Sequence, residues 1–298
     1  QDPGRLVFLD TETTGLAGGT GTVAFLVGLA FLSEGVLVVR QYLMARFGAE
    51  EALLAEVARD LHGAGGVVTY NGKSFDGPLL AARFRLAGRS DPLGALPHLD
   101  LLHPVRRLFA GCLTDCRLAT AERQLLGFVR EDDLPGWQVP MAWLDYVRQG
   151  EAARLPAVVR HNRRDLVSLA ALLPALGEAH GDPEAVGGDT LAVARAFARA
   201  GEEGRALDLL ERVRPRLDPA GLLELARLYR RCGRWEPAIA IWGGLADNGC
   251  RESLERLAKY HEHVRRDPRR ALVHAAQLAG SPEGDHRVRR LRAKIGEP

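Results

Sequence analysis

Two acidic side chains follow a short apolar run near the start of the chain. The run 6–9 leads into Asp10 and Glu12, and Gly15 follows in a turn. Because alternate side chains of a strand point to the same face, Asp10 and Glu12 project together from the end of a buried strand. Two carboxylates at such close range repel each other, and a hard divalent cation such as Mg²⁺ or Mn²⁺ relieves this repulsion. The stretch therefore predicts part of a metal site.

Partners for this pair stand at the ends of other predicted elements. Asp76 follows the apolar strand 67–70, and Asp165 follows His161 by four residues. Residues four apart are neighbours on one helix face, so His161 and Asp165 lie together. Four carboxylates can hold two cations about 4 Å apart for phosphodiester hydrolysis, one activating a water and the other stabilising the leaving oxygen. A histidine with a pKa of about 6.5 can accept the proton of that water.

The elements that position these residues alternate between strands and helices. Two β-branched apolar runs, 23–32 and 36–44, flank Ser33-Glu34-Gly35 and predict a hairpin paired with the first strand. Further strands are expected over 67–70 and 98–102, and helices over 50–61, 78–84, 103–109, 118–126, 142–148, 152–161 and 163–176. This order predicts an α/β fold with a mixed central sheet and flanking helices.

A second region follows a stretch rich in glycine, aspartate and proline. We interpret 177–189 as a linker between a domain at 1–176 and a helical domain at 190–298. Residues of the helical part recur after 32 positions: Ala194, Phe197, Ala206, Leu210 and Val213 return as Ala226, Tyr229, Ala238, Trp242 and Leu245. Ala258 and Ala271 suggest a third copy, 13 residues apart rather than 12, and 285–295 a cap. The spacing resembles tetratricopeptide repeats; a generic helical bundle is the alternative.

Composition limits the class of protein. The 298 residues are 46% hydrophobic and 26% charged, as in a globular chain of two domains. A net charge of +2, from 40 basic and 38 acidic residues, gives no global positive field. The four cysteines are too few and too irregular for a disulfide framework or a zinc site. The most apolar run, 23–32, falls short of the roughly 20 residues that span a bilayer, so we expect a cytoplasmic protein with no membrane partner.

The acidic residues also match three known motifs in order. Asp10-x-Glu12, Asn71-x3-Phe75-Asp76 and His161-x3-Asp165 resemble the motifs of the DEDD exonucleases of the RNase H-like superfamily. The resemblance covers about residues 5–176 and is closer still to the YprB-like branch, predicted bacterial nucleases whose RNase H-like domain is often joined to tetratricopeptide repeats. The stretches that carry this closer resemblance are 9–16, 70–76, 100–108, 132–136 and 161–165.

The resemblance implies a fold and an activity. The expected fold is an RNase H-like mixed sheet with flanking helices, followed by an all-α tetratricopeptide-like repeat domain. The expected activity is a 3′ to 5′ exonuclease on single-stranded DNA or RNA. Two divalent cations, Mg²⁺ or Mn²⁺, are its expected cofactors. Their implied ligands are Asp10, Glu12, Asp76 and Asp165.

The third motif departs from one subgroup of the family. Four positions separate His161 from Asp165, the spacing of the tyrosine subgroup, whereas the histidine subgroup uses five. One position on a helix rotates a side chain by about 100°. Three roles for His161 therefore stay open: general base, donor to a substrate phosphate, or structural residue.

Other residues are candidates for contact with the substrate. By resemblance, Thr13, Gly15 and Leu16 meet the terminal nucleotide, and Asn71 and Phe75 shape the same pocket unless they serve as a helix cap and a core aromatic. Arginine binds phosphate with two parallel hydrogen bonds. The basic candidates, each alternatively a solvated surface charge, are Lys73, Arg106, Arg107, Arg163 and Arg164. Asp100, Asp132 and Asp133 are possible supporting acids.

Two rival functions accompany the nuclease hypothesis. The first is a non-catalytic adaptor that grips nucleic acid while its repeats recruit a protein partner. Retention of all four acids argues against it. The second is a structure-specific endonuclease. In the nuclease hypothesis too, the repeats bind a protein partner or extend the path of the nucleic acid.

Overall fold

The structure is a computed structural model that describes residues 5–15, 21–131 and 133–297. Leu16 and Asp132, both named above, lie outside the described residues. The chain forms two compact units, Gln1–Asp189 and Thr190–Pro298, and each is described by itself.

A mixed sheet of five strands lies at the centre of the first unit. Its strands are β1 (Leu6–Thr13), β2 (Ala24–Ser33), β3 (Val36–Leu43), β4 (Gly66–Thr69) and β5 (His98–Asp100), in the spatial order β3-β2-β1-β4-β5. Strand β2 is antiparallel to β1 and β3, whereas β4 is parallel to β1 and β5. The predicted mixed sheet and the predicted hairpin are therefore confirmed.

The hairpin between β2 and β3 has a tight two-residue turn. Ser33 pairs with Val36, and the residues between them, Glu34 and Gly35, have φ values of 51° and 81°. Positive φ at both central positions defines the turn that matches the right-handed twist of paired strands. Glycine adopts this conformation without steric cost, which explains the Glu-Gly sequence.

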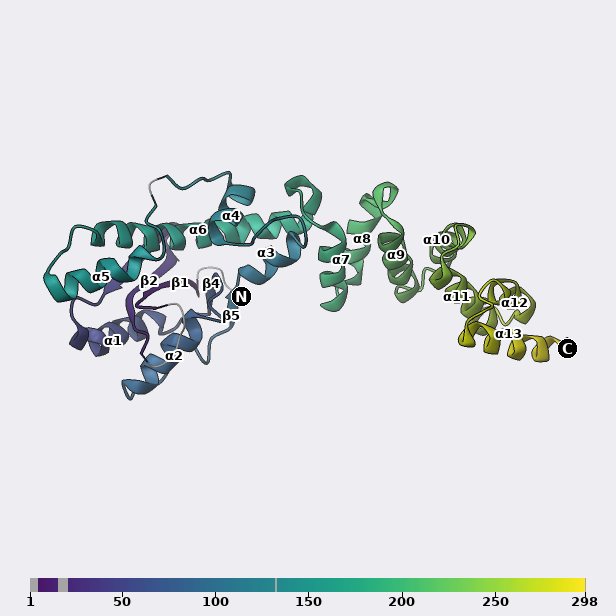
Figure 1. Ribbon diagram of the computed structural model, residues 1–298, viewed down its shortest axis with the longest axis horizontal. Coiled ribbons are helices and arrows are strands. Elements are labelled where there is room, and N and C mark those ends of the chain that lie inside the picture. The colour runs from purple at the N-terminus through teal and green to yellow at the C-terminus, as the bar shows by residue number, and fades with distance from the viewer. Residues whose placement is uncertain (1–4, 16–20, 132, 298) are drawn as a thin grey trace. The chain divides into compact units, whose positions relative to one another are not determined.

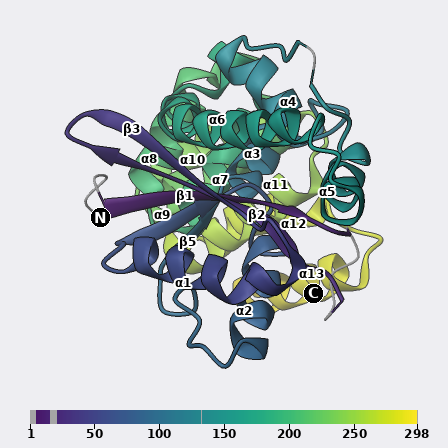
Figure 2. The same cartoon turned by 90° about the vertical axis from the view of Figure 1, so that its left-hand side faces the viewer.

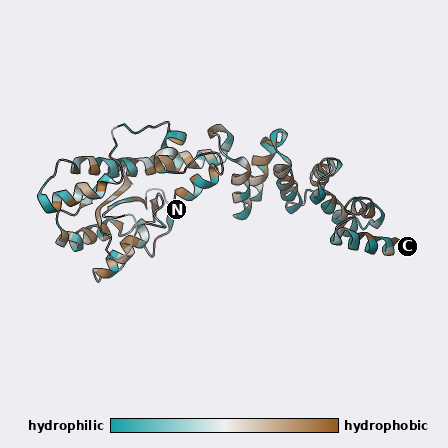
Figure 3. Ribbon diagram, in the orientation of Figure 1, coloured by the Kyte–Doolittle hydropathy of each residue, from teal (hydrophilic) through white to brown (hydrophobic). Residues whose placement is uncertain are grey.

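Helices cover both faces of the sheet. In Figures 1 and 2, α6 lies on one side of the strands, and α1 and α2 lie on the other. The helical elements are α1 (Glu50–Leu61), α2 (Asp76–Leu86), α3 (Leu102–Leu108), α4 (Leu118–Ala121), α5 (Gln138–Gln149) and α6 (Leu155–Gly181), with 3-10 turns η2 (Phe47–Ala49) and η4 (Pro183–Val186) and the π turn η3 (Glu122–Leu126). Strand colour is mainly that of hydrophobic residues in Figure 3, as expected for strands covered on both faces.

Aromatic packing anchors α5 against the sheet. The ring of Trp143 stacks on Phe25 of β2 with centroids 5.0 Å apart, and both side chains are fully buried. Its indole N–H donates a hydrogen bond of 2.7 Å to the Met44 carbonyl oxygen. The buried polar atom of the tryptophan is thus satisfied, as burial requires.

A glycine lets α6 approach the sheet closely. Gly28 of β2 lies opposite Asp10 of β1. A Cβ atom at this position would lie 2.2 Å from Asn162 Oδ1 and 2.6 Å from a Leu166 methyl carbon. Only a residue without a side chain fits, so Gly28 sets how near α6 comes to the end of β1.

The second unit is built of consecutive helices. They are α7 (Thr190–Arg199), α8 (Glu203–Arg212), α9 (Pro219–Arg231), α10 (Trp235–Asp247), α11 (Arg251–Lys259), α12 (Pro268–Ala276) and α13 (Pro282–Ile295), with the 3-10 turn η5 (Arg214–Arg216) and the π turn η6 (Tyr260–Val264). Each helix packs against the next. Asp218, Asp267 and Ser281 cap α9, α12 and α13 through their side-chain oxygens, and proline follows each of them at the first helical position.

The recurring alanines lie where these helices touch. All of them are fully buried: Ala194, Ala206, Ala226, Ala238, Ala258 and Ala271. The third copy has one extra residue between its alanines, and the π turn η6 lies between Ala258 and Ala271. A π turn absorbs a single inserted residue without ending the helix. Ala258 and Ala271 can therefore both stay buried although one extra residue separates them.

The last helix of the first unit is longer than the sequence pattern indicates. We expect helix up to Leu176, whereas α6 continues to Gly181 and contains Pro174. After η4, the Gly188 N–H donates to the Pro183 oxygen at 2.7 Å and the Asp189 N–H to the Leu108 oxygen at 2.6 Å. The segment interpreted as a linker, 177–189, is thus ordered within the first unit. The separate roles of the two units stay a prediction.

No helix in the described ranges combines the length and the apolar character needed to cross a bilayer.

Candidate active site

Asp10 lies within β1, and a chain of amide side chains holds its carboxylate. Asn162 of α6 donates from Nδ2 to Asp10 Oδ2 at 2.7 Å and to the Asp10 carbonyl oxygen at 3.2 Å. Gln41 of β3 donates in turn to Asn162 Oδ1 at 2.8 Å and to the Val159 oxygen at 2.9 Å. Asn162 is fully buried, so its amide is fixed. Strands β1 and β3 and helix α6 together orient the Asp10 carboxylate.

Asp76 reaches the same strand along its open edge. Strand β4 pairs with β1 only from Leu6 to Phe8, so the rest of this edge of β1 is free of a neighbouring strand within the described residues. The chain turns after β4, and Asp76 begins α2. Its Oδ1 accepts a short hydrogen bond from the Thr11 hydroxyl. The length difference between the two strands thus places the buried Asp76 carboxylate beside the end of β1.

The turn before Asp76 is held by a buried acid. Asp100 accepts the backbone N–H groups of Asn71 at 2.7 Å, Lys73 at 3.0 Å and Leu102 at 3.0 Å. Asn71 has a φ of 64°, in the left-handed region that asparagine tolerates better than most residues. Asp100 therefore shapes the turn that presents Asp76.

His161 and Asp165 face these carboxylates from α6. His161 Nε2 lies 3.8 Å from Asp165 Oδ2 and 4.0 Å from Glu12 Oε1. Its other nitrogen, Nδ1, lies 2.7 Å from Asp133 Oδ1. An ionised carboxylate only accepts hydrogen bonds, so Nδ1 carries the proton of this contact and Nε2 faces the acidic cluster.

The acidic cluster consists of Asp10, Glu12, Asp76 and Asp165, and its members disturb one another's ionisation. Burial raises the pKa of Asp10, and the charges of the other three carboxylates raise it further against the opposing hydrogen bond from Asn162. Burial likewise raises the pKa of Glu12 to about 8 and that of Asp76 to about 6. It also raises the pKa of Asp165, although His161 and Arg130 oppose this. The five residues predicted from the motifs thus share one site.

His161 and Asp133 shift in opposite directions. Burial lowers the pKa of His161, but the charges of Asp165 and Glu12 and the contact with Asp133 outweigh it, so the pKa is raised. Burial raises the pKa of Asp133, but hydrogen bonds from His161 and Arg130 outweigh it, so the pKa is lowered. Asp133 therefore stays ionised and holds the imidazole.

Arg130 is a cation built into this site. Its guanidinium donates twice to Glu122, at 2.7 and 2.6 Å, and once to Asp133 Oδ2 at 3.0 Å. Its Nη2 also lies 2.6 Å from Asp165 Oδ1. Glu122 is fully buried, and the Arg130 side chain is only 9% exposed. The arginine thus links the π turn η3 and the segment before α5 to a member of the acidic cluster.

The donor chemistry of the acidic cluster fits hard divalent cations. All four ligands would be carboxylates, and their raised pKa values reflect negative charge that nearby cations would neutralise. Asp165 Oδ1 is buried and accepts no well-aligned hydrogen bond from the described residues. Over the described ranges, no three His, Cys, Asp or Glu side chains already stand in a metal-holding arrangement.

These pKa shifts predict how the stability of the metal-free protein depends on pH. A carboxyl group with a raised pKa in the folded state contributes stability below its unfolded pKa and loses it as pH rises through the folded value. The raised pKa of His161 acts in the same direction. We therefore expect the melting temperature in EDTA to fall from about pH 4 to about pH 8, because the contribution of Asp76 is lost by about pH 6 and that of Glu12 by about pH 8. The change is followed by circular dichroism.

Glu12→Gln is the matched comparison for this measurement. Because it removes the group with a pKa of about 8, its melting temperature falls less over the upper part of the window. A melting temperature that rises with pH in EDTA would contradict the repulsion among these carboxylates.

Comparison with known proteins agrees with this geometry. The sequence pattern of the RNase H superfamily matches residues 7–176, which are more than half of the chain. The matched part contains the whole acidic cluster. The chain belongs to the RNase H superfamily.

Two individual proteins are similar to this RNase H superfamily chain. An uncharacterized protein of Bacillus subtilis (strain 168), YprB, is 35% identical over 288 residues, which cover 92% of this chain and 68% of YprB. The family B DNA polymerase of the hyperthermophilic archaeon Pyrobaculum calidifontis has a TM-score of 0.48 and 17% identity. That match covers 76% of this chain and 29% of the polymerase.

Several predicted substrate residues of this RNase H superfamily chain lie near the acidic cluster in sequence and structure. Thr13 ends β1, just after an irregularity in pairing between Glu12 and Thr13, and its hydroxyl donates to the Gly15 oxygen at 2.9 Å. Phe75 is the residue before α2 and is half-buried. Asn71 and Lys73 have exposed side chains on the turn that Asp100 holds.

Only some of the basic side chains predicted to contact phosphate lie beside the acidic cluster. Arg164 donates to the Glu131 carbonyl oxygen at 3.3 Å, and its Nη1 lies 4.0 Å from Asp133 Oδ1, beside the cluster. Arg106 and Arg107 are exposed in the last turn of α3. In the described ranges the structure gives neither of them a contact with the four carboxylates. Of the predicted arginines, it thus brings Arg164 to the site and leaves Arg106 and Arg107 on the surface of α3.

Sequence reasoning missed three supports of the site. Asn162 stands directly after the predicted His161, so its place in the third motif is a local signal for a role in the site. Glu122 and Arg130 carry no such signal, because their pairing depends on how residues 127–131 return to α6. Asp133, predicted only as a supporting acid, binds His161.

Proposed function

We propose that the first unit is a metal-dependent nuclease that hydrolyses phosphodiester bonds of single-stranded DNA or RNA from the 3′ end. One observation carries the proposal: in a chain of the RNase H superfamily, four carboxylates and one oriented histidine from β1, α2 and α6 converge on one site. Superfamily membership supports nuclease chemistry. The direction of attack and the preference for single strands extend this to the DEDD subtype that the motifs resemble.

The acidic cluster is the proposed holder of two Mg²⁺ or Mn²⁺ ions. When bound, such ions supply Lewis-acid activation of a water and neutralise charge on the phosphate. Asn162 keeps Asp10 oriented, and Thr11 does the same for Asp76. Arg130 places a positive charge against Asp165 and so opposes the rise in its pKa that burial causes. These contacts fix the ligands before substrate arrives, which is the condition for efficient catalysis.

His161 is the proposed general base. Asp133 takes the proton-bearing Nδ1, so the free electron pair of a neutral His161 lies on Nε2 and faces Glu12 and Asp165. A water among these groups can lose its proton to Nε2 as it attacks the phosphorus. The four-residue spacing to Asp165 is thus compatible with a base, because the imidazole points to the carboxylates from the same face of α6.

The remaining contacts are proposed from the motif residues and the second unit. Thr13, Gly15, Asn71 and Phe75 surround the terminal nucleotide, and Leu16, outside the described residues, keeps its predicted role. Lys73, Arg106, Arg107 and Arg164 contact phosphates. The second unit, with buried alanines at each helix contact, acts as a tetratricopeptide-like platform for a protein partner.

The proposal is tested on single strands with a label at either end. We expect the intact protein with Mn²⁺ or Mg²⁺ to shorten linear strands from the 3′ end and to leave circular single strands intact. Asp10→Ala and Asp165→Ala should be inert. Cleavage of the circles would instead support the structure-specific endonuclease.

One observation favours the adaptor as a second candidate. Arg130 already places a positive charge against Asp165, one of the four acids. In an adaptor this charge would replace a metal ion permanently, and the site would bind phosphates without hydrolysing them. Equal inertness of the intact protein and both alanine variants, with strand binding retained, would establish this function.

The role of His161 gives a separate prediction. His161→Gln should reduce the rate of strand hydrolysis by about 10²- to 10⁴-fold, the usual contribution of a general base. The remaining rate should lose the rise with pH that deprotonation of His161 produces in the intact protein. Rates measured with saturating Mn²⁺ between about pH 6 and 9 report both effects.

His62→Gln is the matched control, because His62 is exposed at the end of α1. A His161→Gln variant with the rate and pH profile of the intact protein would assign a structural role to the histidine.

A further inference from the structure

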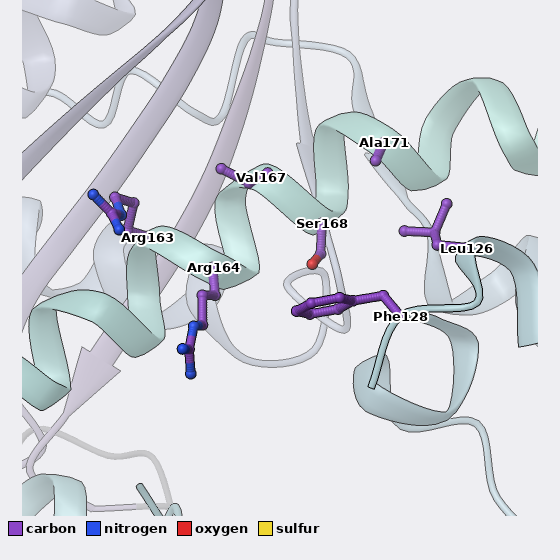
Figure 4. A pocket seen from close by; sticks show the side chains of 7 residues that line it. All are labelled: Leu126, Phe128, Arg163, Arg164, Val167, Ser168 and Ala171. Atoms are coloured by element: carbon purple, nitrogen blue, oxygen red, sulfur yellow. The ribbon is translucent and has the colours of Figure 1, made fainter. Parts of the chain in front are cut away.

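A pocket lies on α6 beside the acidic cluster. It has a volume of about 500 Å³ and is formed by two segments, the end of η3 with Phe128 on one side and one face of α6 on the other. Figure 4 shows the Phe128 ring beside the α6 turn that bears Arg164 and Ser168. Pockets of this size hold one small organic group such as a nucleoside.

The walls of the pocket are apolar and reachable from solvent. Phe128 is 42% exposed and Val167 is 46% exposed, and Leu126 and Ala171 extend the apolar surface. Large hydrophobic side chains that are exposed together mark binding surfaces on soluble domains. An aromatic ring at the edge of such a surface offers a flat face on which a nucleobase can stack.

The charged rim of the pocket is positive. Arg163 and Arg164 line it, and in Figure 4 their side chains leave α6 on different sides. Arg163 is exposed and has no carboxylate partner within the described ranges. Within the described residues, the contacts of Arg164 with the Glu131 carbonyl oxygen and, at 4.0 Å, with Asp133 Oδ1 both involve Nη1, so its Nε and Nη2 can still donate to a ligand. A base-stacking wall flanked by guanidinium groups matches a nucleotide with its phosphates.

The pocket and the acidic cluster share helix α6. Arg164 directly precedes Asp165, so neighbouring faces of one helix serve both places. The segment that carries Phe128 is anchored at both ends: the Phe128 N–H donates to the Glu122 oxygen at 3.3 Å, and Arg130 binds Glu122 and Asp165. Contacts to the acidic cluster therefore hold the Phe128 wall in place before any ligand binds.

We propose that this pocket is a nucleotide subsite for the substrate strand. It takes one base of a single-stranded nucleic acid against Phe128 and Val167, and Arg163 and Arg164 take its neighbouring phosphates. This inference rests on the proposed nuclease function. Because the subsite on α6 adds contacts that a single nucleotide does not make, longer strands bind more tightly.

The test compares a short and a long substrate with the full chain. The short substrate is the p-nitrophenyl ester of thymidine 5′-monophosphate, and the long one is a single strand of about ten nucleotides, within the range that single-strand binders cover. For Phe128→Ala, we expect KM on the strand to rise about 5- to 100-fold relative to the change on the ester, because stacking on one aromatic ring contributes this much. Arg163→Ala should lower the salt dependence of strand binding by about one counterion.

Val129→Ala is the matched control, because Val129 is exposed next to Phe128 but does not line the pocket. It should behave as the intact protein on both substrates. Equal KM changes on strand and ester for Phe128→Ala would overturn the subsite and leave the pocket to an apolar side chain of a protein. If the intact protein hydrolyses neither substrate, the nuclease function itself fails, whereas hydrolysis with an unaltered strand KM in Phe128→Ala refutes only the subsite.

Discussion

Asp10→Asn is expected to lower the rate of single-strand hydrolysis by on the order of 10³-fold while the protein stays folded. Asparagine has nearly the shape of aspartate, and its side-chain oxygen can still accept the hydrogen bond from Asn162. The change therefore removes one negative charge and keeps the packing. Because the charges of Glu12, Asp76 and Asp165 all act on Asp10, this removal alters the field in which the whole cluster binds cations.

The measurement is a time course of end-labelled strands with Mn²⁺, together with a melting curve. Loss of the repulsion should leave the metal-free variant at least as stable as the intact protein, so a loss of rate cannot be assigned to unfolding. Asp60→Asn is a control in the same unit, because Asp60 pairs with Arg40 and Tyr42 away from the cluster. Asp10→Asn with an unchanged rate would show that Asp10 has no part in catalysis.

Arg130→Met is expected to lower the free energy of unfolding by about 3–5 kcal/mol, the usual cost of leaving one partner of a buried ion pair without the other. Glu122 is fully buried, and Arg130 donates both of the hydrogen bonds that its carboxylate receives at 2.6 and 2.7 Å. Methionine keeps much of the length of the side chain but supplies no donors. The buried carboxylate must then be protonated or exposed to water, and both cost free energy.

Urea unfolding with EDTA present measures this effect. Arg59→Met is the matched control, because Arg59 pairs with Glu56 on the exposed face of α1 and should change stability by less than about 1 kcal/mol. The double variant Arg130→Met, Glu122→Gln should recover part of the loss, since it removes the buried charge together with its partner. A single Arg130→Met variant as stable as the Arg59 control would show that Glu122 is not held by this pair.

Local patterns in the sequence were sufficient for the elements that carry the acids. Alternation along a strand puts Asp10 and Glu12 on one face of β1, and four-residue spacing puts His161 and Asp165 on one face of α6. The turn at Glu34-Gly35 follows from an equally local rule. The alanines that are buried in the second unit were indicated instead by a recurrence after 32 positions.

Contacts between segments that are distant in sequence could not be predicted from these local patterns. Arg130 meets Glu122 and Asp165 only because the segment after η3 returns to α6, and no periodicity encodes that path. Asn162 contacts Asp10 across 152 positions, and this needs the absence of a side chain at Gly28. Asp76 reaches β1 because β4 is the shorter strand. Such supports arise from packing geometry, which becomes visible only in three dimensions.

In the third motif, too, part of the geometry could be predicted from the sequence and part could not. Its spacing was enough to place His161 beside Asp165, but the direction of the imidazole depends on Asp133. Asp133 stands in a polar stretch with no element of its own, where the sequence offers only the acidic character of a supporting residue. The structure adds the 2.7 Å contact that leaves Nε2 facing the cluster.

The central claim is that these four carboxylates hold divalent cations. Titration of the intact protein with Mn²⁺ at about pH 8, followed by electron paramagnetic resonance of the free ion, tests it most directly. We expect two bound ions per chain, and binding weakened at least about tenfold in both Asp10→Asn and Asp165→Asn. Failure of the intact protein to bind Mn²⁺, or binding by both variants as tight as that of the intact protein, would contradict this.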